Sequence, residues 1–512
     1  MDRPVVELSH AGVSPAEVIS VARGGAQTAL TESAVEAINR CRAIVESMID
    51  CNEAVYGITT GFGSLAQTFI ERDQREALQQ NLIRARAAGM GDPVEPEVIR
   101  AMMLLRARTL AMGYSGARLV VVQTLLDVLN AGILPLVPEH GSLGASGDLA
   151  PLAHIALVLS GEGFVIADSG LRPATEALAE HGITPLKFEA KDGVSLINGT
   201  DGMLGMLVLA CHDIRRLLAT AEIAAAMTIE GLLGTNRAFA EDLHDLRPHQ
   251  GQKTSAKNLM LLLEGSPIVA SHRYDDPRVQ DAYSLRCTPQ VIGAARDTLR
   301  HAEEIADIEL HSAVDNPVVL PDGRIESGGN FHGAPLGYAC DFLAVALADV
   351  CSMAERRIDR MLDVTRSEGL PAFLTTDPGV NSGMMSGHYT VAGICAENRR
   401  LAAPASVDSM PTSAGQEDHV SMGWGAARKL RQLVANTARV LAVELVAASR
   451  GLDFRAPLEP GASTGAVHRV IRLHVDPPAT DRYLAPELAA VEAIVLDGAI
   501  VEAAESVIGA LA

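Results

Sequence analysis

The sequence contains few aromatic residues and far fewer basic than acidic ones. Phe, Tyr and Trp number 9, 7 and 1 among 512 residues. Because aromatic rings favour strands, this scarcity favours a helical fold. Lys and Arg total 42 against 63 Asp and Glu, which gives a formal net charge of −21. A surface of that sign repels a phosphate backbone or an anionic membrane, so we predict neither as a partner.

Signals for disulfides, metal binding and export are also missing. The seven cysteines are scattered and form no CxxC pair, which indicates reduced thiols rather than a disulfide framework or a zinc cluster. The fifteen histidines show no metal-ligand spacing, so we predict no metal. The N-terminus lacks a basic segment followed by an apolar one, and the apolar runs are broken well short of a membrane span. We therefore expect a cytoplasmic protein.

The chain is rich in long apolar stretches with helical spacing. Hydrophobic residues make up 48% of it and charged residues 21%, which excludes disorder for the bulk. Long helices without internal proline are predicted over residues 203–233, 290–310, 336–362 and 425–450. Such rods pack side by side, so we expect a mainly α fold, an elongated bundle of parallel and antiparallel helices. The expected domains are a loop-rich N-terminal region carrying the site (1–200), a central helix bundle (201–452) and a C-terminal helical cap (453–512).

Residues 141–154, Gly-Ser-Leu-Gly-Ala-Ser-Gly-Asp-Leu-Ala-Pro-Leu-Ala-His, are the most informative stretch. The plain interpretation is a glycine loop before a helix with Asp148 as its N-cap. A phosphate-binding loop is disfavoured because no Gly-Lys-Ser/Thr is present. The chemistry suggests more: Gly147 lacks a side chain, so its nitrogen can approach the Ala145 carbonyl carbon. Cyclisation, with loss of water from the ring and from Ser146, would leave a methylene conjugated to carbonyls, which is a strong electrophile.

This stretch resembles the core motif of the histidine, phenylalanine and tyrosine ammonia-lyases. In that family Ala-Ser-Gly becomes 4-methylidene-imidazol-5-one (MIO). Further matching segments, spread over nearly the whole chain, lie at residues 56–63, 196–200, 280–287, 315–317, 328–332 and 416–422. Residues 283–287 and 417–419 are more similar to the histidine branch than to the plant phenylalanine branch.

The resemblance implies a reaction and an assembly. Ammonia is lost from an L-α-amino acid, leaving a trans α,β-unsaturated acid, and the histidine branch converts histidine to urocanate. MIO forms autocatalytically from Ala145, Ser146 and Gly147, bonds to the substrate amine and makes ammonia a better leaving group. No metal or nucleotide is implied. The family also implies a homotetramer in which each site draws loops from several subunits.

The resemblance also assigns roles to single residues. Tyr56 is the base that removes the β-proton, and its phenol must be activated by neighbouring donors. Arg286 fits bidentate capture of the substrate carboxylate. Tyr283 and Asn198 would hydrogen-bond MIO or the carboxylate. The alternatives are a hydrogen-bonded core tyrosine at position 56 and a surface ion pair at position 286.

Other residues would shape the pocket. Gly63 lets the backbone approach the site, Gln280 is a polar neighbour, and Phe331 packs against the MIO ring or belongs to the core. His388 follows Ser386 and Gly387, where the family usually carries larger aliphatic residues and a glutamine, so we expect a roomier, more polar pocket there.

Arg86 is the main departure from the histidine branch. Those enzymes usually carry Ser-His where this chain has Ala85 and Arg86, and that histidine contacts the substrate ring. Arg86 could pair with Glu417 and weaken imidazole recognition, or recognise an anionic side chain. In a third interpretation it points into solvent and histidine remains the substrate.

Two alternatives to an ammonia-lyase stay open. The same chemistry serves 2,3-aminomutases, which return the amine to the β-carbon. An inactive helical scaffold is the other alternative, although the intact residues at positions 56, 146, 198, 283 and 286 argue against it. The mass of the chain separates a matured protein from a scaffold, because MIO formation removes two waters.

Overall fold

The structure is a computed structural model that describes residues 4–49, 60–61, 68–274 and 276–512. The fold is mainly helical, as predicted, with only short strands among the described residues. The chain divides into two compact units that interleave along the sequence. The first consists of Met1–Leu209, Ala302–Asp341 and Pro404–Arg428, and the second of Ala210–His301, Phe342–Ala403 and Lys429–Ala512. The three consecutive domains suggested by the sequence stay a prediction.

Four long helices each contribute residues to both units. They are α9 (Asp201–Gly231), α14 (Thr288–Leu310), α15 (Ala334–Leu362) and α17 (Gly423–Asp453). They coincide with the four predicted stretches to within a few residues, because the stretches are rich in strong helix formers and contain no interior proline. By length and composition α15 alone among the described helices could cross a membrane, but 56% of its apolar window is buried in the protein, as in a core helix.

The first unit combines shorter helices with small sheets. Its helices are α1 (Pro15–Ala22), α2 (Glu32–Ile49), α3 (Arg75–Arg86), α4 (Pro96–Ala111), α5 (Leu119–Asn130), α6 (Leu149–Leu159), α7 (Ala174–Glu180) and α8 (Asp192–Ile197). Strand β1 (Val5–Leu8) pairs in parallel with β2 (Gln27–Leu30). The antiparallel pairings join β3 (Met90–Pro93) to β5 (Pro138–His140), β4 (Leu134–Pro135) to β6 (Phe164–Ala167), β6 to β7 (Gly170–Pro173), and β8 (Val318–Val319) to β9 (Ile325–Glu326).

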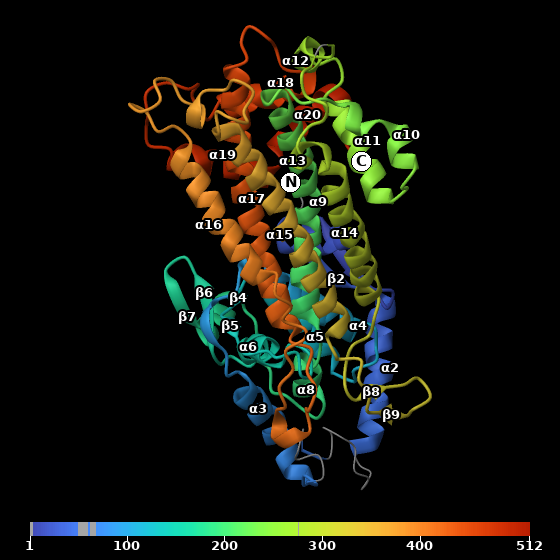
Figure 1. The fold of residues 1–512 in the computed structure, drawn as a ribbon. Coiled ribbons are helices and arrows are strands. Elements are labelled where there is room, and N and C mark those ends of the chain that lie inside the picture. The colour runs from blue at the N-terminus through green and yellow to red at the C-terminus, as the bar shows by residue number, and fades with distance from the viewer. Residues whose placement is uncertain (1–3, 50–59, 62–67, 275) are drawn as a thin grey trace. The chain divides into compact units, whose positions relative to one another are not determined.

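The second unit consists of helices joined by loops and contains no strand among its described residues. Its remaining helices are α10 (Glu241–Asp245), α11 (Gln250–Leu262), α12 (Pro267–Ser271), α13 (Tyr283–Arg286), α16 (Met385–Leu401), α18 (Ala462–Arg472), α19 (Ala485–Asp497) and α20 (Ala499–Ile508). Helices α18 and α20 lie side by side, as Figure 1 shows. Single 3₁₀ turns lie at Arg72–Gln74, Arg237–Phe239, Ala372–Leu374 and Ser413–Gly415.

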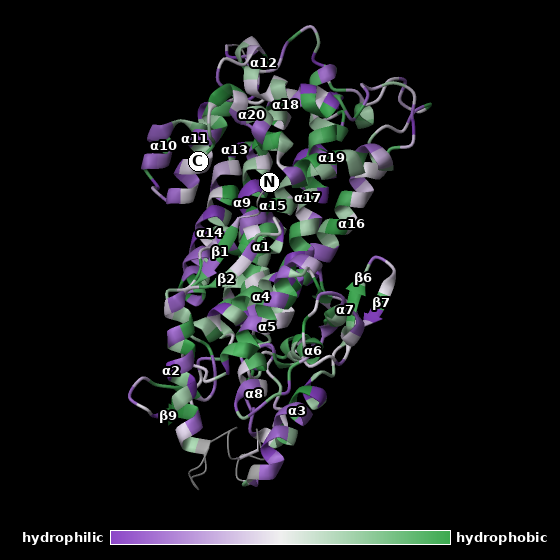
Figure 2. Cartoon of the chain, turned by 180° about the vertical axis from the view of Figure 1, so that it is seen from behind, coloured by the Kyte–Doolittle hydropathy of each residue, from purple (hydrophilic) through white to green (hydrophobic). Residues whose placement is uncertain are grey.

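Helix α6 fixes the glycine loop that precedes it. Leu152, Ile155 and Leu159 recur at three- and four-residue spacing and are at most 3% exposed, so the helix is anchored in the core. Figure 2 shows α6 as hydrophobic along its length, whereas α3 in the same unit is largely hydrophilic. The loop at residues 141–148 therefore leads into a rigid element.

Candidate active site

Residues 144–147 form a tight turn that requires glycine at both ends. Gly144 and Gly147 have φ values of +68° and +71° and pair with each other across the turn. A Cβ atom on Gly147 would lie 2.1 Å from the carbonyl oxygen of Gly199, and one on Gly144 would lie 2.0 Å from the Oγ of Ser421. Both contacts are far too short for any side chain, so the turn holds its backbone against two neighbouring segments.

Those neighbours belong to motifs that the sequence singled out. The Asp148 N–H donates to the carbonyl oxygen of Gly199 at 2.7 Å, and the Met422 N–H donates to that of Leu143 at 2.8 Å. The Ser421 hydroxyl donates to the Gly144 carbonyl at 3.3 Å. The segments at 196–200 and 416–422 therefore both contact the turn.

Asn198 connects the turn to two further motifs. The Ser146 hydroxyl donates to its Oδ1, while its Nδ2 donates to the carbonyl oxygen of Asn316 at 2.6 Å. The Asn316 side chain in turn accepts from the N–H of Gly328 at 3.0 Å. Five of the motifs that are distant in sequence thus converge in the first unit, around Ser146.

Asp148 occupies the N-cap position of α6, as predicted, but its carboxylate does not cap that helix. Oδ2 instead accepts from the N–H groups of Gly202 and Met203, at 2.8 and 3.0 Å, in the first turn of α9. The predicted N-cap position is confirmed, but the carboxylate bonds to a different helix, because tertiary contact offers it the N-terminus of α9. Burial raises the pKa of Asp148 from 3.8 to about 7 even though these N–H groups favour the ionised form.

This raised pKa makes stability depend on pH in a definite direction. Between pH 4 and 7 folded Asp148 keeps a proton that the unfolded chain has lost, so stability falls as pH rises through this window and is level above it. The test compares Asp148→Asn with its parent, and both carry Ser146→Ala to remove any effect of maturation. From pH 4 to pH 7 we expect the free energy of unfolding of Asp148→Asn to rise relative to that of the parent by up to about 4 kcal/mol. Urea midpoints at several pH values measure the difference, and a gap that stays constant from pH 4 to 7 would contradict it.

The turn fits the chemistry of MIO formation. Ser142 clamps it from within, since its Oγ accepts from the Gly144 N–H at 3.1 Å and donates toward the Gly147 carbonyl oxygen at 3.3 Å. The space beside Gly147 admits only hydrogen, and the hydroxyl that would be lost from Ser146 is held by the buried Asn198 amide. A constrained turn that presents a serine hydroxyl to an amide is the arrangement that ring closure and dehydration need.

Four predicted site residues belong to the second unit: Gln280, Tyr283, Arg286 and His388. The Arg286 Nε donates to the carbonyl oxygen of Asp281 at 2.9 Å, which sets its guanidinium 4.6 Å from the centre of the Tyr283 ring. Tyr283 is 70% exposed. The terminal nitrogens of Arg286 make no further bond within the described part of the chain, which leaves them available to a carboxylate.

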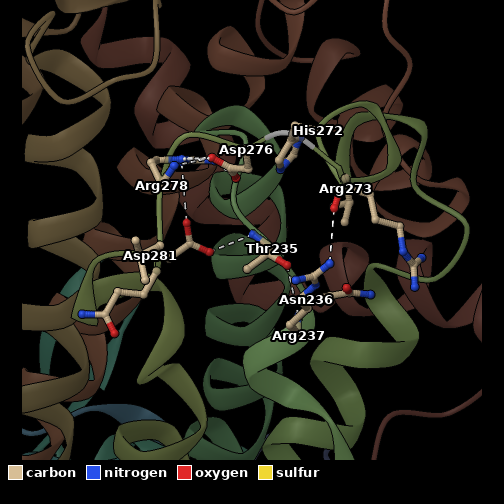
Figure 3. Close-up of a pocket in the computed structure, with 11 residues that line it drawn as sticks. Thr235, Asn236, Arg237, His272, Arg273, Asp276, Arg278 and Asp281 are labelled. Carbon is tan, nitrogen blue, oxygen red and sulfur yellow. Dashed lines mark hydrogen bonds and ion pairs between the residues drawn. The ribbon is translucent and has the colours of Figure 1, made fainter.

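Gln280 lines a small cavity of about 90 Å³ on the same loop. Figure 3 shows how the neighbouring Asp281 anchors that loop: its carboxylate accepts from the Thr235 N–H at 2.7 Å and lies 3.6 Å from an Arg278 nitrogen. Arg278 is itself paired with Asp276 at 2.9 Å. The loop that carries Gln280 into α13 is therefore fixed by ion pairs.

The residues predicted to shape the pocket make different contacts in the structure. Arg86 ends α3 and makes no ion pair with Glu417 among the described residues; Glu417 accepts from the Thr412 hydroxyl at 2.7 Å instead. His388, in the first turn of α16, contacts Glu355 at 2.8 Å. Phe331 is half-buried beside His332, whose ring stacks on that of His419 at 5.8 Å.

Tyr56 and Gly63 lie outside the residues that the structure describes, so their roles stay predictions. Within the described residues, no group of three or more His, Cys, Asp or Glu side chains is arranged to hold a metal ion. Sequence reasoning missed the clamp residue Ser142 and the contact of Ser421, although both lie inside quoted motifs. It also missed the buried Lys191, which belongs to no motif.

Comparison with known proteins identifies the family of this chain. A family model described as aromatic amino acid lyase matches residues 13–473. The chain therefore belongs to the aromatic amino acid lyase family, and its enzyme class is that of the ammonia-lyases. Among curated proteins it is 54% identical to histidine ammonia-lyase of Streptomyces avermitilis, over 99% of both chains. It is 48% identical to histidine ammonia-lyase of Gloeobacter violaceus, over 97% of this chain and 96% of the relative.

Solved structures give the same family and one further activity. Histidine ammonia-lyase from Trypanosoma cruzi is 38% identical, with a TM-score of 0.90 over 98% of this chain and 95% of the other. A tyrosine aminomutase from Streptomyces globisporus is 36% identical, with a TM-score of 0.93 over 99% of each chain. The fold is thus shared by lyases and aminomutases, so it does not by itself separate the two reactions.

Proposed function

We propose that this protein is an MIO-dependent histidine ammonia-lyase, which eliminates ammonia from L-histidine to give urocanate. The observation that carries the proposal is the glycine turn with the Ser146 hydroxyl held by Asn198. The names of the relatives at 48–54% identity support histidine as the substrate.

The cofactor is built from the chain itself in this proposal. Ala145, Ser146 and Gly147 cyclise autocatalytically, and the finished ring supplies an electrophile that withdraws electron density from the substrate amine. The resemblance implies that Asn198, which is buried, hydrogen-bonds the MIO group or the substrate carboxylate. Phe331 packs against the ring.

The remaining residues bind and orient the amino acid. Arg286 takes the carboxylate through its terminal nitrogens, and Tyr283 supports it with a hydroxyl. Tyr56 removes the β-proton, and Gly63 gives its loop the room to approach. Gln280 and His388 line the pocket, although the Glu355 contact ties His388 to its own unit.

A homotetramer completes the site in this proposal. Tyr283 and Arg286 belong to a different unit of the chain from Ser146, and Tyr283 is largely exposed, so both are available to a neighbouring subunit. The acidic surface and the free thiols of the described cysteines are consistent with a reducing cytoplasm. A small amino acid is the partner, without nucleic acid or membrane.

A panel of L-amino acids assayed for ammonia release tests the substrate. We expect the highest kcat/KM for L-histidine, with urocanate as product and Ser146→Ala as the blank. Release of ammonia from another amino acid in preference to histidine would overturn the substrate assignment. A β-amino acid product without free ammonia would identify an aminomutase, the activity of the Streptomyces globisporus relative.

Arg86 offers a sharper test of the imidazole pocket. We expect Arg86→His to raise kcat/KM for L-histidine several-fold, because the histidine enzymes that this chain resembles usually carry histidine at this position. Arg84→His is the matched control: it lies on the same helix but pairs with Glu162 at 2.7 Å, and it should leave kcat/KM unchanged. No change or a loss in Arg86→His would favour a different native substrate.

A further inference from the structure

Beneath Asn198 lies a buried ion pair that none of the assigned roles uses. The Lys191 Nζ donates to Asp315 Oδ2 at 2.9 Å and to the Ser195 hydroxyl at 3.1 Å. The side chains of Lys191 and Asp315 are 0% and 1% exposed. A buried charge pair is rarely a source of stability, because desolvation offsets the attraction, so its presence calls for another reason.

Helix α8 links this pair to the site. Lys191 is the N-cap of α8 and has a left-handed backbone with φ of +72°, whereas Asn198 is the C-cap of the same helix. The residues beside Lys191 are tied down as well, since Arg42 donates to the Ala190 carbonyl at 2.8 Å and Arg118 contacts Asp192 at 2.7 Å. Both ends of this short helix therefore turn side chains toward Asp315.

Asp315 and its neighbour decide which way the Asn198 amide faces. The two ends of an amide have nearly the same shape, so only hydrogen bonding distinguishes them. The Asn316 carbonyl, at 2.6 Å, and Asp315 Oδ1, at 3.5 Å, can only accept, so both require the Nδ2 end. Oδ1 is then left to face Ser146, and it accepts from the hydroxyl.

Asp315, and not the thiol of Cys41, is the anion that pairs with Lys191. Burial raises the pKa of the nearby Cys41 thiol to about 11, so this neighbour is neutral at physiological pH. Asp315 Oδ1 also accepts from the Asn316 N–H at 2.7 Å. The carboxylate is therefore held at both oxygens, and the ammonium offsets its charge.

We propose that the Lys191–Asp315 pair is a positioning device for cofactor maturation, which orients Asn198 so that it accepts from the hydroxyl that Ser146 must lose. This inference rests on the proposed function. Ring closure joins the Gly147 nitrogen to the Ala145 carbonyl carbon, and that oxygen leaves as water with the hydrogens of the Gly147 and Ser146 nitrogens. The second water takes the Cα hydrogen and the hydroxyl of Ser146, and the electron pair of the Cα–H bond becomes the new double bond.

The orientation of Asn198 matters in this second step. When the Ser146 hydroxyl donates its hydrogen to Asn198, the lone pairs of its oxygen stay free. One of them can then take up the proton with which the hydroxyl leaves as water. An amide turned the other way would donate to the same oxygen and occupy a lone pair. Lys191 and Asp315 touch neither the substrate nor the reacting atoms, so they are positioning residues.

The test follows loss of two waters from the folded chain by intact mass after synthesis. We expect Lys191→Met/Asp315→Asn, which removes both charges together and so avoids an uncompensated buried ion, to fold but to dehydrate about tenfold more slowly than the wild type. Arg357→Met/Glu444→Gln is the matched control, because it removes a buried pair of the second unit whose side chains are 1% and 0% exposed. This control should dehydrate at the wild-type rate.

Dehydration of the folded double variant at the wild-type rate would overturn the inference. If that variant does not fold, Lys191→Gln/Asp315→Asn provides the second measurement, since it also removes both charges but keeps polar groups at both buried positions. Wild-type dehydration in this second variant also overturns the inference. A wild-type chain that never loses two waters, yet releases ammonia from histidine, would instead overturn the proposed cofactor.

Discussion

Ser146→Ala should prevent the loss of the second water and lower kcat by at least about 10³-fold. The turn at residues 144–147 remains possible in this variant, because its geometry depends on Gly144 and Gly147. Without the hydroxyl there is no second water to lose, so the electrophile cannot form. Intact mass and ammonia release measure the two effects on the same sample.

The control for this variant is Ser160→Ala. Ser160 follows the last turn of α6, and its hydroxyl bonds to the Leu157 carbonyl at 2.9 Å, away from the glycine turn. It should lose two waters and keep wild-type kcat. Full activity in Ser146→Ala, or an undehydrated but active wild type, would remove the basis for the proposed chemistry.

Gly147→Ala should abolish dehydration and lower kcat to a similar extent, about 10³-fold. The added methyl would lie 2.1 Å from the Gly199 carbonyl oxygen, so the turn and the segment at 198–200 must separate. Asn198 then moves away from Ser146, and the N–H bond from Asp148 to Gly199 is lost. Mass and activity again report the outcome, together with the thermal midpoint.

Gly132→Ala separates the effect of this contact from backbone strain. Gly132 has φ of +74°, close to the +71° of Gly147, but a Cβ there meets nothing within 4 Å. It should cost only about 1–2 kcal/mol for the left-handed conformation and should mature and turn over normally. Normal maturation of Gly147→Ala would mean that the turn is more tolerant than its packing indicates.

Local pattern was enough to predict the four long helices, but it did not predict the short strands. The four long helices follow from runs of Ala, Leu, Met and Ile without proline, because helix propensity and period depend on near neighbours in the sequence. The site was predicted through motifs: residues 145–147 and Asn198 do meet, with the serine hydroxyl on the amide. The roles of these and of all the other predicted site residues stay predictions.

Contacts between distant segments were beyond sequence pattern. Asp148 has the sequence context of an N-cap for α6, yet its carboxylate binds the first turn of α9. Arg86 and Glu417 were candidates for an ion pair, but Glu417 accepts from Thr412. In each case several partners satisfy the same side chain, and only the packing of the chain decides which one lies within reach.

The sequence by itself determined the helical class and the family motifs, and it contains the three residues from which we propose that the electrophile forms. It does so because these features are local: composition, periodicity and the order of small residues. Only the tertiary structure decided that Lys191 and Asp315 face each other beneath Asn198 and that Gly147 rests on Gly199. Those contacts join residues that are far apart in the chain. A buried charge, or a glycine that leaves no room for a Cβ atom, affects stability only once the chain has packed around it.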